Sequence, residues 1–315
     1  MRRIVMATTS AAAALALTAS TAWALITPVK VLSLPAVQIL PFSNDAYLAY
    51  ASNSTGHPNH YNADAYRYSD HKIRRLNAAH TQGYDGGFDP GTNTVIYQQI
   101  ANNSSDLYTY NLDTLTRHKL GAIDNTSWEW QPRISTSFIS FFRDFKVSGT
   151  WYVGVFLFDR DTGRLRRLAA YRWVNHPREN GSLGDLYASW TVCWKKTCAA
   201  YVYDVQAGVV RKIPTNNGRP QYGPAVDETN GLVFFVRSGF GCGHGVTIFK
   251  ASIGNLSAAP TKVGTLPAGV DLAGVSASLA LNPGTNEYGY FFSRENCRSG
   301  ASDIYALRGV SPGPV

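Results

Sequence analysis

The sequence predicts an all-β protein folded as a six-bladed β-propeller of four-stranded antiparallel blades, and three observations lead to that prediction. Of the 315 residues, 44% are hydrophobic and 12% aromatic, and only 16% are charged. This composition, with 28 glycines, is typical of strands and tight turns rather than of disordered chain. Two motifs recur along the chain, and no useful length of it shows the 3.6-residue apolar period of an amphipathic helix. Repeated single sheets fit a propeller better than a sandwich or a solenoid.

The first motif is a turn rich in Asp, Asn, Pro or Gly between two apolar runs. The turn Phe88–Asn93 precedes the strand-like run Thr94–Tyr97, and the segments 226–231 and 281–286 stand before similar apolar runs. Residues of this kind favour tight β connections. With the strands of a blade named A to D from the centre outward, we expect each turn to join strand A to strand B.

The second motif is a short aromatic strand followed by a polar turn and a basic strand. After Phe158, for example, the turn Asp159–Gly163 leads to a basic strand. The motif recurs at intervals of about 45 residues, which matches one four-stranded sheet per unit. The six anchor residues, expected in strand C, are Tyr68, Tyr110, Phe158, Tyr203, Phe249 and Leu307.

Together the two motifs resemble the TolB-like or WD40-like β-propeller repeat. In that family an Asp/Pro/Gly turn leads into an aliphatic-aromatic strand, which an "Ile-Tyr" strand and a short basic strand follow. The resemblance covers nearly the whole predicted mature chain and is clearest in units two, five and six. It implies a propeller that acts as a binding scaffold, and it specifies no reaction.

The first 24 residues have the layout of a secretory signal peptide. Arg2 and Arg3 precede an Ala/Leu-rich run, and Ala22–Ala24 provides a cleavage site. We therefore expect a mature propeller domain over residues 25–315, secreted to the extracellular space, without a transmembrane segment. The Ala-rich signal and the Gly/Thr/Ser usage look actinobacterial. Removing the two arginines lowers the formal charge from +8 to +6, a mild bias toward anionic envelope surfaces.

The two ends of the chain predict how the ring closes. The tail after Gly309 contains two prolines and is a poor outer strand, whereas Val29–Leu34 is strand-like and precedes the first A strand. We expect this N-terminal segment to supply the outermost strand of the sixth blade, because closure by both chain ends removes an exposed sheet edge.

Four cysteines follow the predicted signal, and an even number in an exported protein favours disulfides over a zinc site. Cys193 and Cys198 flank one expected hairpin. Cys242 and Cys297 lie in the B–C loops of consecutive blades. Of the three possible pairings, we therefore expect 193–198 and 242–297.

The D–A and B–C loops of a propeller share one face, which we call the loop face. Long loops are expected there, among them 121–131, 144–151 and 171–181. Aromatic and basic residues on or near these loops could recognise a protein or an envelope polymer, although the tryptophans could equally cover the blade ends. The candidates are Trp128, Trp130, Arg133, Arg143, Trp173, Arg178, Trp194 and Arg219.

The sequence contains none of the hydrolase, metalloprotease or nucleotide-binding motifs that would indicate an enzyme. The leading hypothesis is a non-enzymatic, monomeric binding protein without a cofactor, whose partner is a protein or an envelope polymer and not a nucleic acid. The alternative is a calcium-dependent, lactonase-like hydrolase or lyase. Its weak metal-ligand candidates are Asp85, Asp185 and Asp271, which could converge in the central tunnel.

Overall fold

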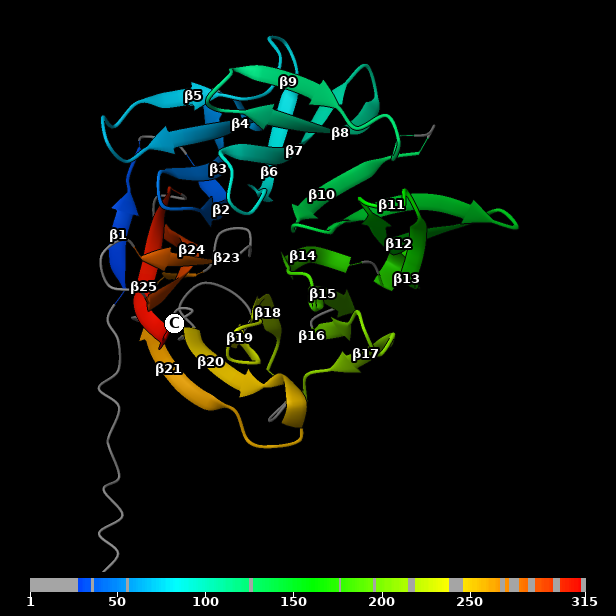
Figure 1. Cartoon of the computed structure of the whole chain (residues 1–315), viewed down its shortest axis with the longest axis vertical. Helices are drawn as coiled ribbons and strands as arrows, with labels where there is room; N and C mark the ends of the chain where they lie inside the picture. The colour runs from blue at the N-terminus through cyan, green and yellow to red at the C-terminus, as the bar shows by residue number, and fades with distance from the viewer. Residues whose placement is uncertain are drawn as a thin grey trace, which may run out of the picture.

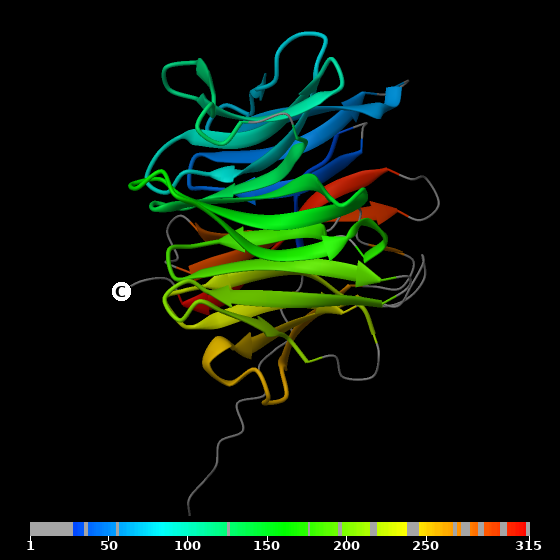
Figure 2. The same ribbon diagram turned by 90° about the vertical axis from the view of Figure 1, so that its right-hand side faces the viewer.

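The computed structural model confirms a ring of six antiparallel sheets around a central axis (Figure 1). Figure 2 views the same ring from its side. Residues 1–24, where the signal peptide is predicted, lie outside the described part of the chain, as do Cys242 and Cys297. The structure describes residues 28–34, 37–54, 57–124, 127–175, 177–194, 197–214, 219–237, 246–266, 270–271, 278–282, 287–296 and 301–312.

The first three blades each contain four strands in the order of the chain. Blade one contains β2 (Gln38–Ser43), β3 (Tyr47–Ser54), β4 (His57–Arg67) and β5 (Ile73–Arg75). Blade two contains β6 (Gln82–Phe88), β7 (Thr94–Ala101), β8 (Ser104–Asn111) and β9 (Thr116–Lys119). Blade three contains β10 (Glu129–Ile134), β11 (Phe138–Val147), β12 (Thr150–Asp159) and β13 (Leu165–Arg172), and the 3-10 turn η1 (Trp173–Asn175) follows it.

The next two blades repeat this order, and the sixth is assembled from both ends of the chain. Blade four contains β14 (Pro177–Leu183), β15 (Tyr187–Trp194), β16 (Thr197–Asp204) and β17 (Val209–Lys212). Blade five contains β18 (Gln221–Asp227), β19 (Leu232–Arg237), β20 (Val246–Ser252), the 3-10 turn η2 (Ile253–Asn255) and β21 (Thr261–Leu266). Blade six contains β22 (Val270–Asp271), β23 (Ser278–Asn282), β24 (Glu287–Asn296), β25 (Ser302–Pro312) and β1 (Val29–Leu32).

The predicted A–B turns lie where the motif placed them. Segment 89–93 joins β6 to β7, and segment 228–231 joins β18 to β19. Gly91 and Gly231 have φ angles of 72° and 60°, a left-handed conformation that glycine adopts without steric cost. The third turn falls between β23 and β24, largely outside the described residues. The local turn chemistry therefore defines the inner end of the repeat.

The first strand closes the ring, as the sequence predicts. β1 pairs antiparallel with β25, with Val29 opposite Ala306, and the two run side by side in Figure 1. Leu32 is buried among Leu48 of blade one and Ile304 of blade six. The strand thus completes one blade and also packs against the next.

The core lies mainly between the blades. Hydrophobic clusters join each blade to its neighbour around the ring; Val95 and Tyr97 of blade two, for example, pack with Ala49 and Ala63 of blade one. Most strands of the blades therefore bury both faces, which explains the low fraction of charged residues. Among the described residues, no helix has the length and hydropathy needed to span a bilayer.

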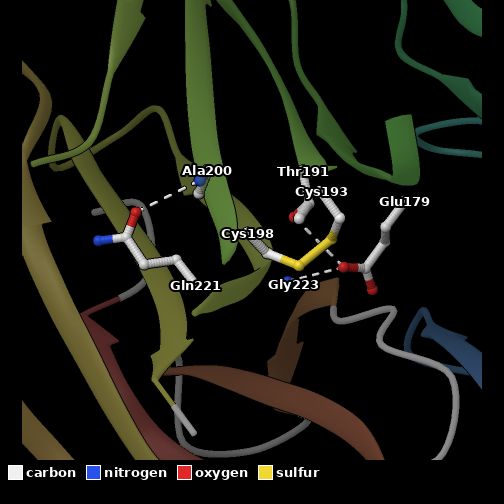
Figure 3. Close-up of a disulfide and its surroundings, with 7 residues drawn as sticks. All are labelled: Glu179, Thr191, Cys193, Cys198, Ala200, Gln221 and Gly223. Atoms are coloured by element: carbon white, nitrogen blue, oxygen red, sulfur yellow. Dashed lines mark hydrogen bonds between the residues drawn. A yellow bond between two sulfur atoms is a disulfide. The ribbon is translucent and has the colours of Figure 1, made fainter. Parts of the chain in front are cut away.

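One of the two predicted disulfides is present. Cys193 and Cys198 face each other across the β15–β16 hairpin of blade four, with Cα atoms 4.0 Å apart. Figure 3 shows the bond beside Glu179, whose Oε2 accepts a hydrogen bond of 2.9 Å from the backbone N–H of Gly223 in blade five. The disulfide therefore fixes the loop-face end of blade four, next to a contact between blades.

Candidate binding site

A groove of about 920 Å³ opens at the loop-face end of blade three. Three chain segments form it: the approach to β10, the β11–β12 hairpin, and the end of β13 with η1. We call it the blade-three groove. Its lining residues are Ser127, Trp128, Asp144, Phe145, Lys146, Thr150, Trp151, Arg172, Trp173 and Val174.

The β11–β12 hairpin is strand almost to its tip, although the sequence predicted a loop over 144–151. Val147 pairs with Thr150, and the two turn residues, Ser148 and Gly149, have φ angles of 47° and 80°. Two consecutive positive φ angles are typical of the tight turn whose twist matches paired strands. Stacking of Phe145 on Tyr152, with centroids 5.7 Å apart, adds cross-strand stabilisation. The hairpin therefore forms a rigid wall that extends from the ring (Figure 1).

Three tryptophans surround the groove with much of their surface in solvent. The exposed fractions of Trp128, Trp151 and Trp173 are 41%, 50% and 48%. Lys146 places its Nζ 4.6 Å from the ring centroid of Trp151, a cation–π contact that orients the indole. Exposed apolar side chains gathered in one concave place are typical of an interaction site.

Asp144 carries the negative charge of the groove. Its Oδ1 accepts a hydrogen bond of 3.1 Å from Trp130 Nε1, and its backbone N–H donates one of 3.1 Å to the carbonyl of Trp128. Burial raises the pKa of Asp144 to about 6, against the opposing effect of the Trp130 hydrogen bond. At pH 7 the carboxylate is mostly ionised, so Lys146 and Arg172 leave the groove with a net charge of about +1.

The groove unites two of the predicted ligand residues, Trp128 and Trp173, with one that sequence analysis missed. Trp151 is the last residue of the expected loop 144–151 on the same face. This position in the sequence could have identified it as a further candidate. Trp130 is half-buried against Phe142, with ring centroids 4.7 Å apart. Its Nε1–H hydrogen bond orients the carboxylate of Asp144. The structure therefore places Trp128, Trp151 and Trp173 around one groove, and ligand binding by them stays a prediction.

The other candidates lie elsewhere. Trp194 is 59% exposed at the β15–β16 hairpin of blade four, outside the groove. Arg219 is exposed before β18, and the side chain of Arg178 lies outside the described part of the chain.

Two arginines proposed for ligand contact are buried and connect structural elements instead. Arg133, 2% exposed, donates from Nε to the carbonyl of Gly181 in blade four at 2.5 Å. Its guanidinium lies 4.2 Å from the ring centroid of Phe42 in blade one. Arg143 pairs its Nε with Glu129 Oε1 at 2.9 Å inside blade three. These arginines therefore do not contribute to the exposed loop face, since their donors are directed into the protein.

A second pocket, of about 710 Å³, lies at the opposite end of the ring among the A–B turns. Two of its carboxylates make contacts between blades. Asp89 pairs with Arg160 at 2.8 Å, and Glu228 accepts hydrogen bonds of 2.6–3.0 Å from the backbone N–H groups of three residues in the blade-four turn. Asp89 and Glu228 thus have a structural role at this pocket.

Of the three residues suggested for tunnel calcium, the structure describes the carboxylate of Asp185 alone. Asp185 lies in the A–B turn of blade four, where Oδ1 accepts a hydrogen bond of 2.9 Å from the backbone N–H of Ser137. Asp271 lies in β22 opposite Glu295, at the loop-face end of blade six. Asp85 pairs with Tyr97 along β6. The backbones of Asp185 and Asp271 are thus at opposite ends of the innermost strands; the side chains of Asp85 and Asp271 are outside the described residues.

Comparison with known proteins gives the fold. No family model and no curated protein matches the sequence. A solved structure of a putative TolB from Agrobacterium tumefaciens superposes over 90% of this chain and 92% of its own, at 13% identity and a TM-score of 0.55. This chain has the TolB-like propeller fold.

Other propellers are also similar. TolB from Acinetobacter baumannii matches over 85% of this chain and 65% of its own, at 12% identity and a TM-score of 0.53. An oligogalacturonate lyase from Vibrio parahaemolyticus matches over 89% and 85%, at 11% identity and a TM-score of 0.50. Because proteins named TolB and an oligogalacturonate lyase share this propeller architecture, the fold does not decide the function.

Proposed function

We propose that this protein is a secreted, non-enzymatic binding protein that captures a protein partner in the blade-three groove. The observation that carries the proposal is the group of Trp128, Trp151 and Trp173, each about half exposed around one concave surface. The predicted signal peptide in residues 1–24 supports an extracellular setting.

The chemistry of the groove favours a polypeptide segment. Tryptophan and arginine are enriched among residues that dominate the energy of protein interfaces, where they lie in concave places that exclude water. Arg172 and Lys146 exceed Asp144 by one positive charge, so the complementary segment combines apolar side chains with a carboxylate. The TolB-like neighbours are consistent with a scaffold for protein interaction.

The test is a selection from a displayed peptide library, followed by calorimetry of the winning peptides. We expect the selected peptides to contain an acidic residue beside an aromatic or branched aliphatic one. Trp151→Ala should weaken their binding by about thirtyfold, as expected for the loss of about 2 kcal/mol at an interface hot spot. Trp194→Ala is the matched control, because it removes a comparably exposed tryptophan from blade four on the same face. It should change the affinity by less than twofold.

Two outcomes would contradict the proposal. Selected peptides that bind Trp151→Ala as tightly as the wild type would place recognition elsewhere. Binding of soluble envelope polysaccharides in the same assay, with no peptide selected, would replace the protein partner with a polymer.

The calcium-dependent hydrolase or lyase stays a prediction without a specific structural argument. The described carboxylate of Asp185 is engaged by the backbone of Ser137, and the likeness to an oligogalacturonate lyase concerns the fold alone.

A further inference from the structure

Three carboxylates converge between blades two and three, outside the blade-three groove. Asp106 lies on β8, Asp124 follows β9, and Glu129 begins β10. These elements belong to adjoining blades (Figure 1). One carboxylate oxygen from each residue lies within 4.8 Å of the other two. Two adjoining blades therefore bring three hard oxygen ligands close together.

Two basic side chains neutralise this cluster incompletely. Lys119 Nζ lies 2.7 Å from Asp124 Oδ2 and 3.3 Å from Asp106 Oδ2. Arg143 Nε donates to Glu129 Oε1 at 2.9 Å. Two positive charges thus face three carboxylates, which leaves a formal charge of −1 when all are ionised. The pKa of Asp106 is raised, first by burial and then by the adjacent carboxyl of Asp124.

The second carboxylate oxygen of Glu129 gives a separate argument for a cation site. The residue is 1% exposed, and its Oε2 is buried without a hydrogen-bond partner. A buried carboxylate oxygen is normally hydrogen-bonded or bound to a metal. Arg143 occupies only the other oxygen, Oε1. The oxygen Oε2 is therefore left to accept a positively charged ligand.

We propose that Asp106, Asp124 and Glu129 bind a calcium ion, and that the ammonium group of Lys119 moves into solvent when it binds. Carboxylate oxygens are ligands of calcium, and oxygens on opposite sides of a calcium ion lie about 4.6–5.2 Å apart, which accommodates the observed spacing. Once Lys119 has left, the two positive charges of calcium and the one of Arg143 equal the three negative charges of the carboxylates. The Lys119 side chain is 40% exposed, so it can leave without crossing the core.

The site is tested by calorimetric titration of calcium into the whole protein after treatment with a chelator. We expect one ion per chain with a Kd at or below about 1 mM, within the range of extracellular calcium modules, and a higher melting temperature in calcium. Asp124→Asn and Glu129→Gln preserve side-chain shape and should each raise the Kd at least tenfold. Circular dichroism without calcium establishes that each variant is folded.

Lys119→Gln tests the proposal more specifically than the ligand variants do, because it should strengthen calcium binding. Because Lys119 competes with the ion for Asp106 and Asp124, removing its charge should lower the Kd severalfold. Asp161→Asn, in an exposed turn on the other face of blade three, is the matched control and should leave the Kd unchanged. Absence of both binding heat and a melting shift at 10 mM calcium would overturn the proposal, as would equal affinities for wild type, Asp124→Asn and Lys119→Gln. Loss of binding in Asp185→Asn alone would place the calcium in the tunnel and overturn this site.

Discussion

The strand that closes the ring makes the most quantitative prediction. Leu32 on β1 is 6% exposed and packs against residues of blades one and six. Shortening a buried leucine to alanine costs about 2–5 kcal/mol, and the lower half of that range suits a four-residue strand at the outside of a blade. We therefore expect Leu32→Ala to lower the free energy of unfolding by about 2–3 kcal/mol and the melting temperature by roughly 5 °C.

The assay is equilibrium unfolding in urea, followed by tryptophan fluorescence, with a calorimetric scan. Val29→Ala is the control on the same strand, where the side chain is 48% exposed, and it should change stability by less than about 0.5 kcal/mol. Deleting residues 25–34 removes the strand and exposes the edge of β25, so we expect unfolding or aggregation. A truncated protein with an unchanged melting temperature would refute the role assigned to β1.

Three further predictions follow from contacts described above. Arg133→Met leaves the carbonyl groups of blade four without their charged donor and should lower the free energy of unfolding in urea by about 2–4 kcal/mol. Arg160→Met removes a partly exposed ion pair and should lower it by less than about 1 kcal/mol. Equal losses of stability in the two variants would contradict a buried structural role for Arg133. Replacing Cys193 and Cys198 together by serine should lower stability by about 2 kcal/mol, because the closed loop is short, and an unchanged urea midpoint would argue against it. Burial raises the pKa of Asp144 in the folded protein to about 6, above the ordinary aspartate value of 3.8, so its ionisation destabilises the folded protein. Between pH 4 and pH 7 the wild type should lose up to about 1–2 kcal/mol of stability relative to Asp144→Asn. Parallel pH profiles of the two proteins would show that the carboxyl is not buried.

The sequence predicted the architecture because the relevant signals are local. A turn such as 89–93 and the strand after it occupy about ten consecutive residues, and their recurrence gives the number of blades. Ring closure was predictable from the poor outer strand near Gly309 and the strand-like segment at Val29. These features depend on backbone conformation and pairing, which neighbouring residues largely determine.

The site was predictable only in part, because side-chain burial depends on distant segments. The sequence predicted that Arg133 and Arg143 lie on the exposed loop face. In the structure Arg133 is buried, and it donates a hydrogen bond to the carbonyl of Gly181 in another blade. The carboxylate cluster likewise draws Asp106 and Glu129 from separate blades, without a spacing that marks them as a set. The sequence also left the tryptophans undecided between exposure and covering the blade ends, because the segments that pack around each indole are not adjacent in sequence.

The pairing of β1 with β25 also dictates the order of folding events. Val29 finds its partner at Ala306, so the ring cannot close until nearly the whole chain has been synthesised. Contacts of such high sequence separation form slowly, because a long loop must be ordered before the pairing is gained. Until that moment the blade-six sheet keeps an open edge and the contact between the first and last blades is absent. The contact that joins the first and last blades therefore forms only after both ends of the chain have been made, whereas each of the first five blades contains all its strands in one continuous segment.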